Sequence, residues 1–294
     1  MAQTEILLLG GSGLVGSSLR RHWRDEIIAP GHAEVDVLDT QALADCLQRS
    51  RASAVVNAIA WADVDGAEAE RDNTQGRVYA LNVDFPQRLA VLCRQFDKHL
   101  VHISTDYVFD GTNAERPYVE TDPTHALCWY AETKLRGEAA VLNSRAPVCV
   151  ARIEMPFTGH NHPKRDLART IVARLEAGQT IQGVTDQRIT PVFLDDAANA
   201  IRQLVESRYN GIIHVAAAGW TTPFEFARSI ARRLALNVDL IREETFERFG
   251  TTRPARRPQH SWLDVSLFES TFGAGILKPV EAQLDVWAKA INRR

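Results

Sequence analysis

The sequence predicts an α/β fold, a doubly wound parallel sheet with a smaller, mixed α/β lobe toward the C-terminus. Three observations predict this class. Short apolar runs alternate with helical patterns through the first half of the chain, the first run ends in a glycine-rich turn, and the second half is less regular. Such alternation indicates parallel strands joined by right-handed crossovers, so a ligand is expected beyond the carboxyl ends of the strands.

The first element is a strand predicted over residues 5–9, followed by a tight turn and a helix over residues 14–24. Gly10 permits the turn, Gly13 lets the backbone approach a pyrophosphate, and Gly16 lets the helix pack on the strand. The unpaired amides and the dipole at the start of the helix favour an anion. The motif predicts a Rossmann-type dinucleotide site, and a plain glycine-rich turn of another α/β protein is the alternative.

The same alternation continues to residue 153. Apolar runs predict strands at residues 27–29, 54–59, 100–104 and 148–153, and helical patterns predict helices at 41–49, 78–96 and 130–143. Ser104, Thr105 and Asp106 fall at the carboxyl end of one strand, and Ala60 and Trp61 fall at another. These strand ends are the predicted positions of ligand-binding residues.

The second half predicts a strand over residues 211–217 and helices over 167–176, 195–206 and 279–291. A further helix begins after Thr222, which can cap it, with Pro223 at its first position. We expect these elements to interleave with the last strands of the main sheet. Residues 1–153 and 187–218 are predicted to form the dinucleotide-binding domain, and residues 154–186 and 219–294 the substrate-binding lobe.

Composition limits the partners. The chain has 294 residues, 45% hydrophobic and 24% charged, and a net charge of −3, which gives no general attraction to nucleic acid or an anionic membrane. No apolar run approaches the roughly 20 residues that span a bilayer. Because the first residues predict a strand rather than a signal peptide, the expected location is the cytoplasm.

No metal site or disulfide framework is predicted. The four cysteines lack paired ligand spacing, which indicates reduced thiols. His160 and His162 resemble metal ligands, but no companion ligands stand at suitable spacing, so a solvated loop is the favoured interpretation.

Tyr130 and Lys134 stand four residues apart in a predicted helix and would project from one face. An ammonium beside a phenol favours the phenolate, so the pKa of Tyr130 is expected below its usual value of about 10. The phenol would then serve as an acid and base near neutral pH. A chance pairing on an ordinary helix is the alternative.

Together with the glycine turn, three segments carry a resemblance to a known family: residues 104–111, 130–138 and 257–264. The chain resembles the extended short-chain dehydrogenase/reductase superfamily, and more closely the dTDP-4-dehydrorhamnose reductase family, over nearly its whole length. Such enzymes reduce the C4 ketone of a nucleotide-linked 4-keto-6-deoxysugar with NADPH or NADH. The resemblance implies an NAD(P)H-dependent oxidoreductase with a nucleotide-linked sugar as substrate, and a homodimer is an open expectation.

The resemblance also implies roles for individual residues. Tyr130 would protonate the substrate oxygen, Thr105 would hydrogen-bond it, and Lys134 would hold the nicotinamide ribose and tune Tyr130. For Thr105, a strand-end hydroxyl bonded only to backbone is the alternative. The implied catalytic residues are Thr105, Tyr130 and Lys134, and the implied cofactor-binding residues are Gly10, Ser12, Gly13, Leu14, Val15, Asp36, Val37, Ala58, Ala60, Ser104, Tyr130 and Lys134.

The adenosine end of the cofactor site is less defined. Asp36 and Val37 match the pair that lies near the adenine in the family, whereas Asp39 is expected to cap the next helix. The second strand is followed by Pro30, Gly31 and His32, with neither an acid for a ribose hydroxyl nor an arginine for a 2′-phosphate. NADP(H) is the expected cofactor, and NAD(H) is the alternative.

The substrate side departs from the family pattern. Ala62 replaces a threonine, and the segment Arg152-Ile153-Glu154-Met155 lacks the tryptophan that follows Arg-Thr-Ser in dehydrorhamnose reductases. A related ketosugar nucleotide is therefore expected. Glu154 is interpreted as an exposed loop acid, with a contact to a polar group of the substrate as the alternative. The implied substrate-binding residues are Val64, Thr105, Asp106, Met155, Arg256 and Arg257.

Three of those assignments have alternatives. Asp106 could equally cap a turn, and Arg256 and Arg257 could clamp a diphosphate or be surface charges. Two other functions also remain open. The first is a non-catalytic subunit resembling the regulatory subunit of methionine adenosyltransferase. The second is another extended-family epimerase or dehydratase, although a dehydratase expects a glutamate where Asp106 is followed by Tyr107.

Overall fold

The computed structural model describes residues 5–291 and contains a central sheet of six parallel strands. The order is β2-β1-β3-β4-β5-β7, so the chain first builds outward from β1 in one direction and then in the other. The predicted doubly wound Rossmann-type sheet is confirmed. Its strands are β1 (Ile6–Leu9), β2 (Ile27–Ile28), β3 (Ala54–Asn57), β4 (His99–Thr105), β5 (Val148–Ile153) and β7 (Gly211–Val215).

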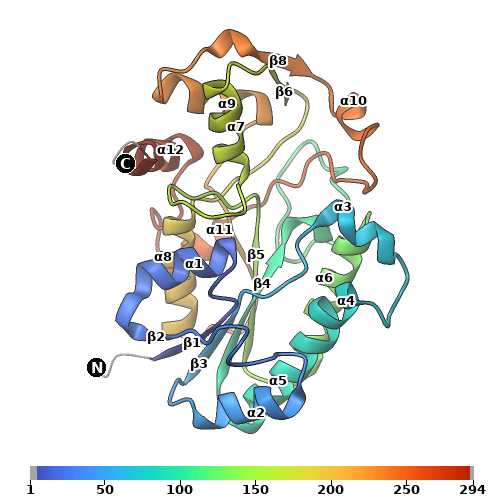
Figure 1. Cartoon of the computed structure of the whole chain (residues 1–294), viewed down its shortest axis with the longest axis vertical. Helices are drawn as coiled ribbons and strands as arrows, with labels where there is room; N and C mark the ends of the chain where they lie inside the picture. The colour runs from blue at the N-terminus through green and yellow to red at the C-terminus, as the bar shows by residue number, and fades with distance from the viewer. Residues whose placement is uncertain (1–4, 292–294) are drawn as a thin grey trace.

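Helices cover both faces of this sheet (Figure 1). One face carries α1 (Leu14–Trp23) and α8 (Leu194–Glu206), and the other carries α2 (Thr40–Arg49), α5 (Phe85–Gln95) and α6 (Trp129–Asn143). Alternate strand residues enter different cores: Ile6 packs in the first and Leu7 in the second. Continuous apolar strands in the sequence therefore reflect burial on both sides.

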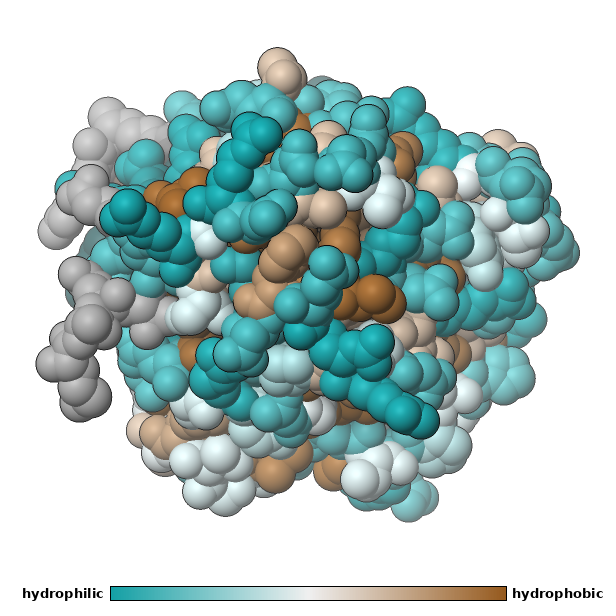
Figure 2. All heavy atoms as spheres, turned by 90° about the horizontal axis from the view of Figure 1, so that it is seen from below, coloured by the Kyte–Doolittle hydropathy of each residue, from teal (hydrophilic) through white to brown (hydrophobic). Residues whose placement is uncertain are grey.

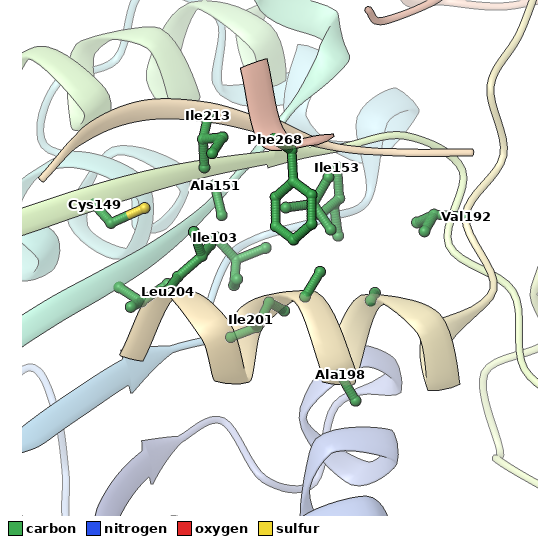
Figure 3. Packing of buried hydrophobic residues seen from close by; sticks show 14 of the residues in the cluster. Ile103, Cys149, Ala151, Ile153, Val192, Ala198, Ile201, Leu204, Ile213 and Phe268 are labelled. Atoms are coloured by element: carbon green, nitrogen blue, oxygen red, sulfur yellow. The ribbon is translucent and has the colours of Figure 1, made fainter. Parts of the chain in front are cut away.

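Figure 3 shows the first of these cores. Ala198, Ile201 and Leu204 of α8 lie under Ile103 and the neighbouring strands β5 and β7. The ring of Phe268, from α11 (Ser266–Phe272), closes the same core near Ile153. The last strand residues before the carboxyl edge are thereby held between α8 and α11.

The helix predicted over residues 78–96 is interrupted. It consists of α4 (Arg77–Tyr79), a π turn over Ala80–Asp84, and α5. Pro86 has no amide proton for the carbonyl four residues earlier, that of Asn82. A Cβ added at Gly137 of α6 would lie 2.1 Å from this same Asn82 oxygen, so α6 packs directly on the widened turn.

A second, two-stranded parallel sheet joins β6 (Ile181–Val184) and β8 (Ile241–Glu244). It packs with α7 (Leu167–Glu176), α9 (Pro223–Arg233) and α12 (Val280–Ile291) around a separate apolar core. A Cβ at Gly183 would lie 2.7 Å from Phe224 Cα, which shows how closely α9 rests on β6. Thr222 accepts from the Glu225 amide at 3.1 Å, so the predicted cap of α9 is confirmed.

Figure 2 views the molecule from the end where α2 and α5 lie, at the amino ends of the main strands. Hydrophilic side chains cover most of this face and apolar ones are scattered. Within residues 5–291, none of the helices has the length and apolar character needed to cross a membrane. The opposite, carboxyl edge of the sheet faces the two-stranded sheet and holds the cavity described below.

Candidate active site

The glycine turn after β1 has no room for a side chain at Gly10, nor does α1 at Gly16. Gly10 has φ +89°, and a Cβ there would lie 2.9 Å from the Ala58 carbonyl carbon. A Cβ at Gly16 would lie 2.0 Å from the Gly10 oxygen, which confirms that Gly16 allows the helix to pack on the turn. The Gly13 amide donates to the Gly10 oxygen at 3.0 Å, and α1 begins directly after it. The start of α1 is therefore presented to the carboxyl edge of the sheet.

A cavity of about 490 Å³ opens at this edge. It contains most of the site residues predicted from the sequence: Gly13, Leu14, Val15, Ala58, Ala60, Val64, Ser104, Thr105, Asp106, Tyr130, Lys134 and Met155. The predicted residues Gly10, Ser12, Asp36, Val37, Arg256 and Arg257 are not in its lining. The cavity thus contains the residues predicted for catalysis and for the nicotinamide end of the cofactor. It does not contain Asp36 and Val37, which were predicted for the adenosine end.

Lys134 is buried at the base of the cavity. Its Nζ donates to the carbonyl of Ile103 at 2.7 Å and lies 3.5 Å from His102 Nε2. Asn57 supports this arrangement, because its Nδ2 lies 3.0 Å from His102 Nδ1 while its Oδ1 accepts from the Ile59 amide. Burial lowers the pKa of Lys134 to about 8, and the charge of Glu138 opposes the fall.

The pKa of Tyr130 differs from the one expected from the sequence. Burial raises the pKa of its phenol above the usual value, and the hydrogen bond with Thr105 opposes the rise. The prediction that this pKa lies below 10 is therefore wrong, because burial outweighs the opposing hydrogen bond; the Lys134 ammonium bonds to the Ile103 carbonyl. Tyr107 packs edge-on against Tyr130, with ring centroids 5.9 Å apart, and also lines the cavity. The phenol of Tyr130 consequently keeps its proton at neutral pH.

Thr105 ends β4 and is almost fully buried. Its Oγ1 accepts from the Tyr107 amide at 3.2 Å and lies 3.0 Å from Asp106 Oδ1, within hydrogen-bond distance. Thr105, rather than Asp106, caps the short turn that follows the strand. The backbone contact predicted as an alternative for Thr105 is present, but the hydroxyl also reaches Tyr130 and Asp106.

Glu154 is not an exposed loop acid; that interpretation is wrong. It is completely buried and its carboxylate accepts from the Thr190 amide at 2.8 Å, from the Thr190 hydroxyl, and from Ser261 Oγ at 2.9 Å. The sequence just after β5 carries no sign of this, because the covering residues come from distant segments. A carboxylate in such surroundings needs these donors to remain inside the protein.

At the predicted adenosine end, Asp36 is exposed and its Oδ1 accepts from the Leu38 amide at 3.0 Å. Val37 packs partly against the core beside α2 and α5. Asp39 accepts from the amides of Gln41 and Ala42 at 2.8 and 3.1 Å, so its predicted capping role is confirmed. These contacts are structural.

The two arginines near the C-terminal lobe differ in their surroundings. Arg257 forms a bidentate pair with Asp65 at 3.0 and 2.8 Å, so its guanidinium already has a carboxylate partner. Arg256 is exposed. Neither lines the cavity.

Another set of cations reaches the cavity and was missed from the sequence. His162, Lys164 and Arg165 line it opposite the glycine turn, and His162 Nε2 lies 2.9 Å from the Ser12 carbonyl oxygen. Residues 161–165 form a mostly exposed loop, as the favoured interpretation expects. Residues 5–291 contain no group of three His, Cys, Asp or Glu side chains that could hold a metal ion. A run of histidine, lysine and arginine so far from the glycine motif gives no sign of its position; only the folded chain brings the two together.

Comparison with known proteins identifies the family. The family model described as RmlD substrate binding domain matches residues 4–290. A probable dTDP-4,6-dihydroxy-2-methyloxan-3-one 4-ketoreductase from Streptomyces antibioticus is 34% identical over 264 residues, covering 87% of this chain and 85% of that protein. A dTDP-4-dehydrorhamnose reductase from Mycobacterium tuberculosis is 33% identical over 267 residues, covering 88% and 84%.

The fold agrees with solved structures. The dTDP-4-dehydrorhamnose reductase of Bacillus anthracis, solved in complex with NADP, has a TM-score of 0.88 at 24% identity, covering 97% of this chain and 98% of that one. At this identity the likeness shows the fold, while the family model and the curated relatives carry the membership. The chain belongs to the RmlD-like family of extended short-chain dehydrogenases/reductases.

Proposed function

We propose that this protein reduces the C4 ketone of a nucleotide-linked 4-keto-6-deoxysugar, with a proton supplied by Tyr130. Family membership identifies the chain as an NAD(P)H-dependent oxidoreductase that acts on a ketone. The observation that carries the finer proposal is the meeting of Thr105, Tyr130 and Lys134 in one cavity beside the glycine turn. Hydride donor, proton donor and oxygen-binding hydroxyl are the three parts that a carbonyl reduction needs.

The cavity fits NADP(H), with NAD(H) as the alternative. The start of α1 after Gly13 suits the pyrophosphate, and the clashes that a Cβ at Gly10 or Gly16 would make with the protein's own backbone show that β1, the turn and α1 pack too closely for a side chain at either position. Ser104 Oγ is buried and has no hydrogen-bond partner among residues 5–291, as expected of a group that awaits a ligand. Bound nicotinamide supplies the hydride.

Each of the three residues has a distinct task. Tyr130 keeps its proton at neutral pH and donates it to the ketone oxygen as negative charge develops there. Thr105 donates a hydrogen bond to the same oxygen. Lys134, fixed by its bond to Ile103, has two further ammonium protons with which to hold the nicotinamide ribose and favour the phenolate that Tyr130 leaves behind.

The sugar side supports a related 4-ketosugar as substrate. Ala62 and Met155 line the cavity where the family pattern has a threonine and a tryptophan. Met155 has φ +37°, an unusual conformation for a non-glycine residue, so its backbone is held by its neighbours. We propose that residues 154–186 and 219–294 form the lobe that surrounds the sugar nucleotide; the outermost residues, 1–4 and 292–294, lie outside the described chain.

The test is to follow NADPH and NADH absorbance with purified protein and a panel of nucleotide-linked 4-ketosugars that includes dTDP-4-dehydrorhamnose and dTDP-4-keto-6-deoxyglucose. We expect oxidation of the cofactor by the wild type and none by Tyr130→Phe. Cofactor binding without turnover on any member of the panel would contradict the proposal and favour a regulatory role. Turnover by the phenylalanine variant at the wild-type rate would show that another group is the acid.

A further inference from the structure

Two buried carboxyl groups lie behind the proposed active-site hydroxyl. Asp106, directly after β4, and Glu154, directly after β5, are 2% and 0% exposed. Ser261 lies between them: its Oγ donates to Glu154 Oε1 at 2.9 Å and it also contacts the Asp106 carboxyl. These two acids were interpreted differently from their local sequence, and neither interpretation predicted that they would meet.

The pair is enclosed by segments from three parts of the chain. The Thr190 amide and hydroxyl both donate to Glu154 Oε2, and the Leu263 amide donates to Thr190 Oγ1 at 3.0 Å. The segment that carries Ser261 crosses the loop after β4 at Gly111, where an added Cβ would lie 2.5 Å from the Gln259 amide nitrogen. The serine is therefore positioned by packing.

A count of the hydrogen bonds shows that Asp106 accepts from fewer donors than Glu154 does. The Ser261 hydroxyl has one proton, which it gives to Glu154. Asp106 Oδ2 is buried without a hydrogen-bond partner among residues 5–291. A carboxylate there would be both poorly solvated and close to the charge of Glu154, so a proton on Asp106 relieves both costs.

The proton on Asp106 decides what Thr105 can do. An ionised Asp106 accepts the Thr105 proton across their 3.0 Å contact, and the threonine then has none for a substrate. A protonated Asp106 donates to Thr105 instead. With the Tyr107 amide as second donor, the threonine oxygen is then fully used as an acceptor, and its own proton is directed toward Tyr130 and the cavity.

We propose that Glu154 is a positioning residue: through Ser261 and its own negative charge it keeps Asp106 protonated, and the protonated Asp106 makes Thr105 a hydrogen-bond donor to the substrate oxygen. This inference rests on the proposed function and deepens it. The pair needs no net proton transfer in the reaction, because Asp106 only orients the threonine hydroxyl.

The surroundings agree with a shared proton. Burial raises the pKa of Asp106 to about 7, and burial together with the charge of Asp106 raises the pKa of Glu154 to about 8. This order alone favours the proton on Glu154. We assign the proton to Asp106 because Glu154 accepts from three donors, the Thr190 amide, the Thr190 hydroxyl and Ser261, whereas Asp106 Oδ2 has no partner among residues 5–291. The groups that oppose these shifts are hydroxyls and amides: Thr105, Ser261 and the Tyr107 amide act on Asp106, and Thr190 and Ser261 act on Glu154. The phenols of Tyr107 and Tyr130 face Asp106 and have raised pKa values themselves, so they stay neutral.

The first test needs no substrate. Infrared difference spectra across a pH titration of the holoprotein should show a protonated carboxyl band that persists near neutral pH and is absent in Asp106→Asn. In Glu154→Gln the band should titrate at lower pH, because the neighbouring charge is gone. A band that is unaffected by both substitutions would overturn the shared proton, whether or not the protein reduces any ketosugar.

The second test is the pH profile of kcat/KM with whichever 4-ketosugar nucleotide the wild type reduces. In Glu154→Gln the alkaline fall of kcat/KM should occur about one pH unit lower than in the wild type. At a pH above both transitions, this shift lowers kcat/KM about tenfold. Glu120→Gln is the matched control, since the Glu120 side chain is only 8% exposed and its carboxylate also accepts from a backbone amide, that of His214 at 2.9 Å. Its profile should match the wild type.

A double variant separates orientation of Thr105 from a general structural effect. In the Thr105→Val background, which has no hydroxyl to orient, Glu154→Gln should cause no further shift of the limb. An equal shift in both backgrounds, or none in either, would refute the role of Glu154. Absence of turnover with a normal infrared titration would instead contradict the proposed function alone.

Discussion

Glu138→Ala tests how the helix that carries Tyr130 and Lys134 is fixed. The Glu138 carboxylate forms a bidentate pair with Arg152 of β5 at 3.0 and 2.8 Å, and both side chains are 2% exposed. The Arg152 guanidinium also lies 5.0 Å from the centre of the Phe109 ring. Removal of Glu138 leaves a buried guanidinium without its carboxylate.

The expected loss is large because the charge that remains cannot reach water. Breaking one partner of a buried pair costs about 3–5 kcal/mol of unfolding free energy, whereas an exposed pair on a helix contributes about 0.3–0.5 kcal/mol. Glu132→Ala is the matched control: Glu132 lies on the same helix and pairs with Arg136 at 2.7 Å, with side chains 36% and 43% exposed. Because both substitutions place alanine in α6, helix propensity cancels in the comparison.

Urea unfolding followed by tryptophan fluorescence and circular dichroism measures both variants. Glu138→Ala should lower the urea midpoint with an unchanged slope. Glu132→Ala should leave the free energy of unfolding within about 1 kcal/mol of the wild type. Equal losses in the two variants would refute the argument, since burial is the main difference between the pairs.

Three other predictions concern the site itself. Tyr130→Phe should lower kcat by about 10²–10⁴-fold while the Kd for NADPH, measured by calorimetry, stays within a few-fold, because the proton is needed only in the chemical step; a matching loss of cofactor affinity would argue for a binding role. Lys134→Met should make the protein without cofactor more stable than the wild type at pH 7, and the difference in unfolding free energy should narrow as the pH rises. The pKa of Lys134 is about 8 in the folded protein against 10.5 in the unfolded chain. The cost of a buried ammonium is therefore full below pH 8 and fades above it. Denaturant midpoints at pH 7 and pH 9 measure this, and a gap that widens with pH would contradict it. Gly16→Ala should abolish NADPH binding, since its Cβ would lie 2.0 Å from the Gly10 oxygen, while Gly250→Ala, with no atom within 4 Å, should bind normally; tight binding by the Gly16 variant would show that the turn can relax.

Much of the fold was predictable because apolar periodicity is local. The predicted strand at residues 148–153 and the predicted helix at 167–176 agree with β5 and α7 at both ends. Strands β6 and β8 were missed, because each has four residues and β8 ends in Arg242, Glu243 and Glu244, which do not form an apolar run. The π turn before α5 was missed too, since the spacing of apolar residues continues across it.

The site was predictable where function needs a local motif and not where it depends on contacts between distant segments. In the glycine turn and in the tyrosine–lysine pair, the residues of the motif lie within a few positions of one another in the sequence, and the strand-end threonine directly follows an apolar run. Glu154 was misjudged because the residues that bury it, Thr190 and Ser261, are far away in sequence. For Arg257, a diphosphate clamp and a surface charge were both left open, because nothing in its own segment indicates that Asp65 would pair with it.

The segment around Tyr130 shows why a catalytic motif extends beyond the residues that do chemistry. Four residues along α6, Lys134 bonds to the end of β4, and four further on, Glu138 pairs with β5. Between them Gly137 allows contact with the carbonyl of Asn82, and Thr133 receives the Asn82 side-chain amide at 3.0 Å. One helical face is thus tied to two strands and to the π turn. A phenol must lie within a fraction of an ångström of its target to transfer a proton well. The glycine and the glutamate of this segment therefore serve the placement of Tyr130, although neither approaches the cavity.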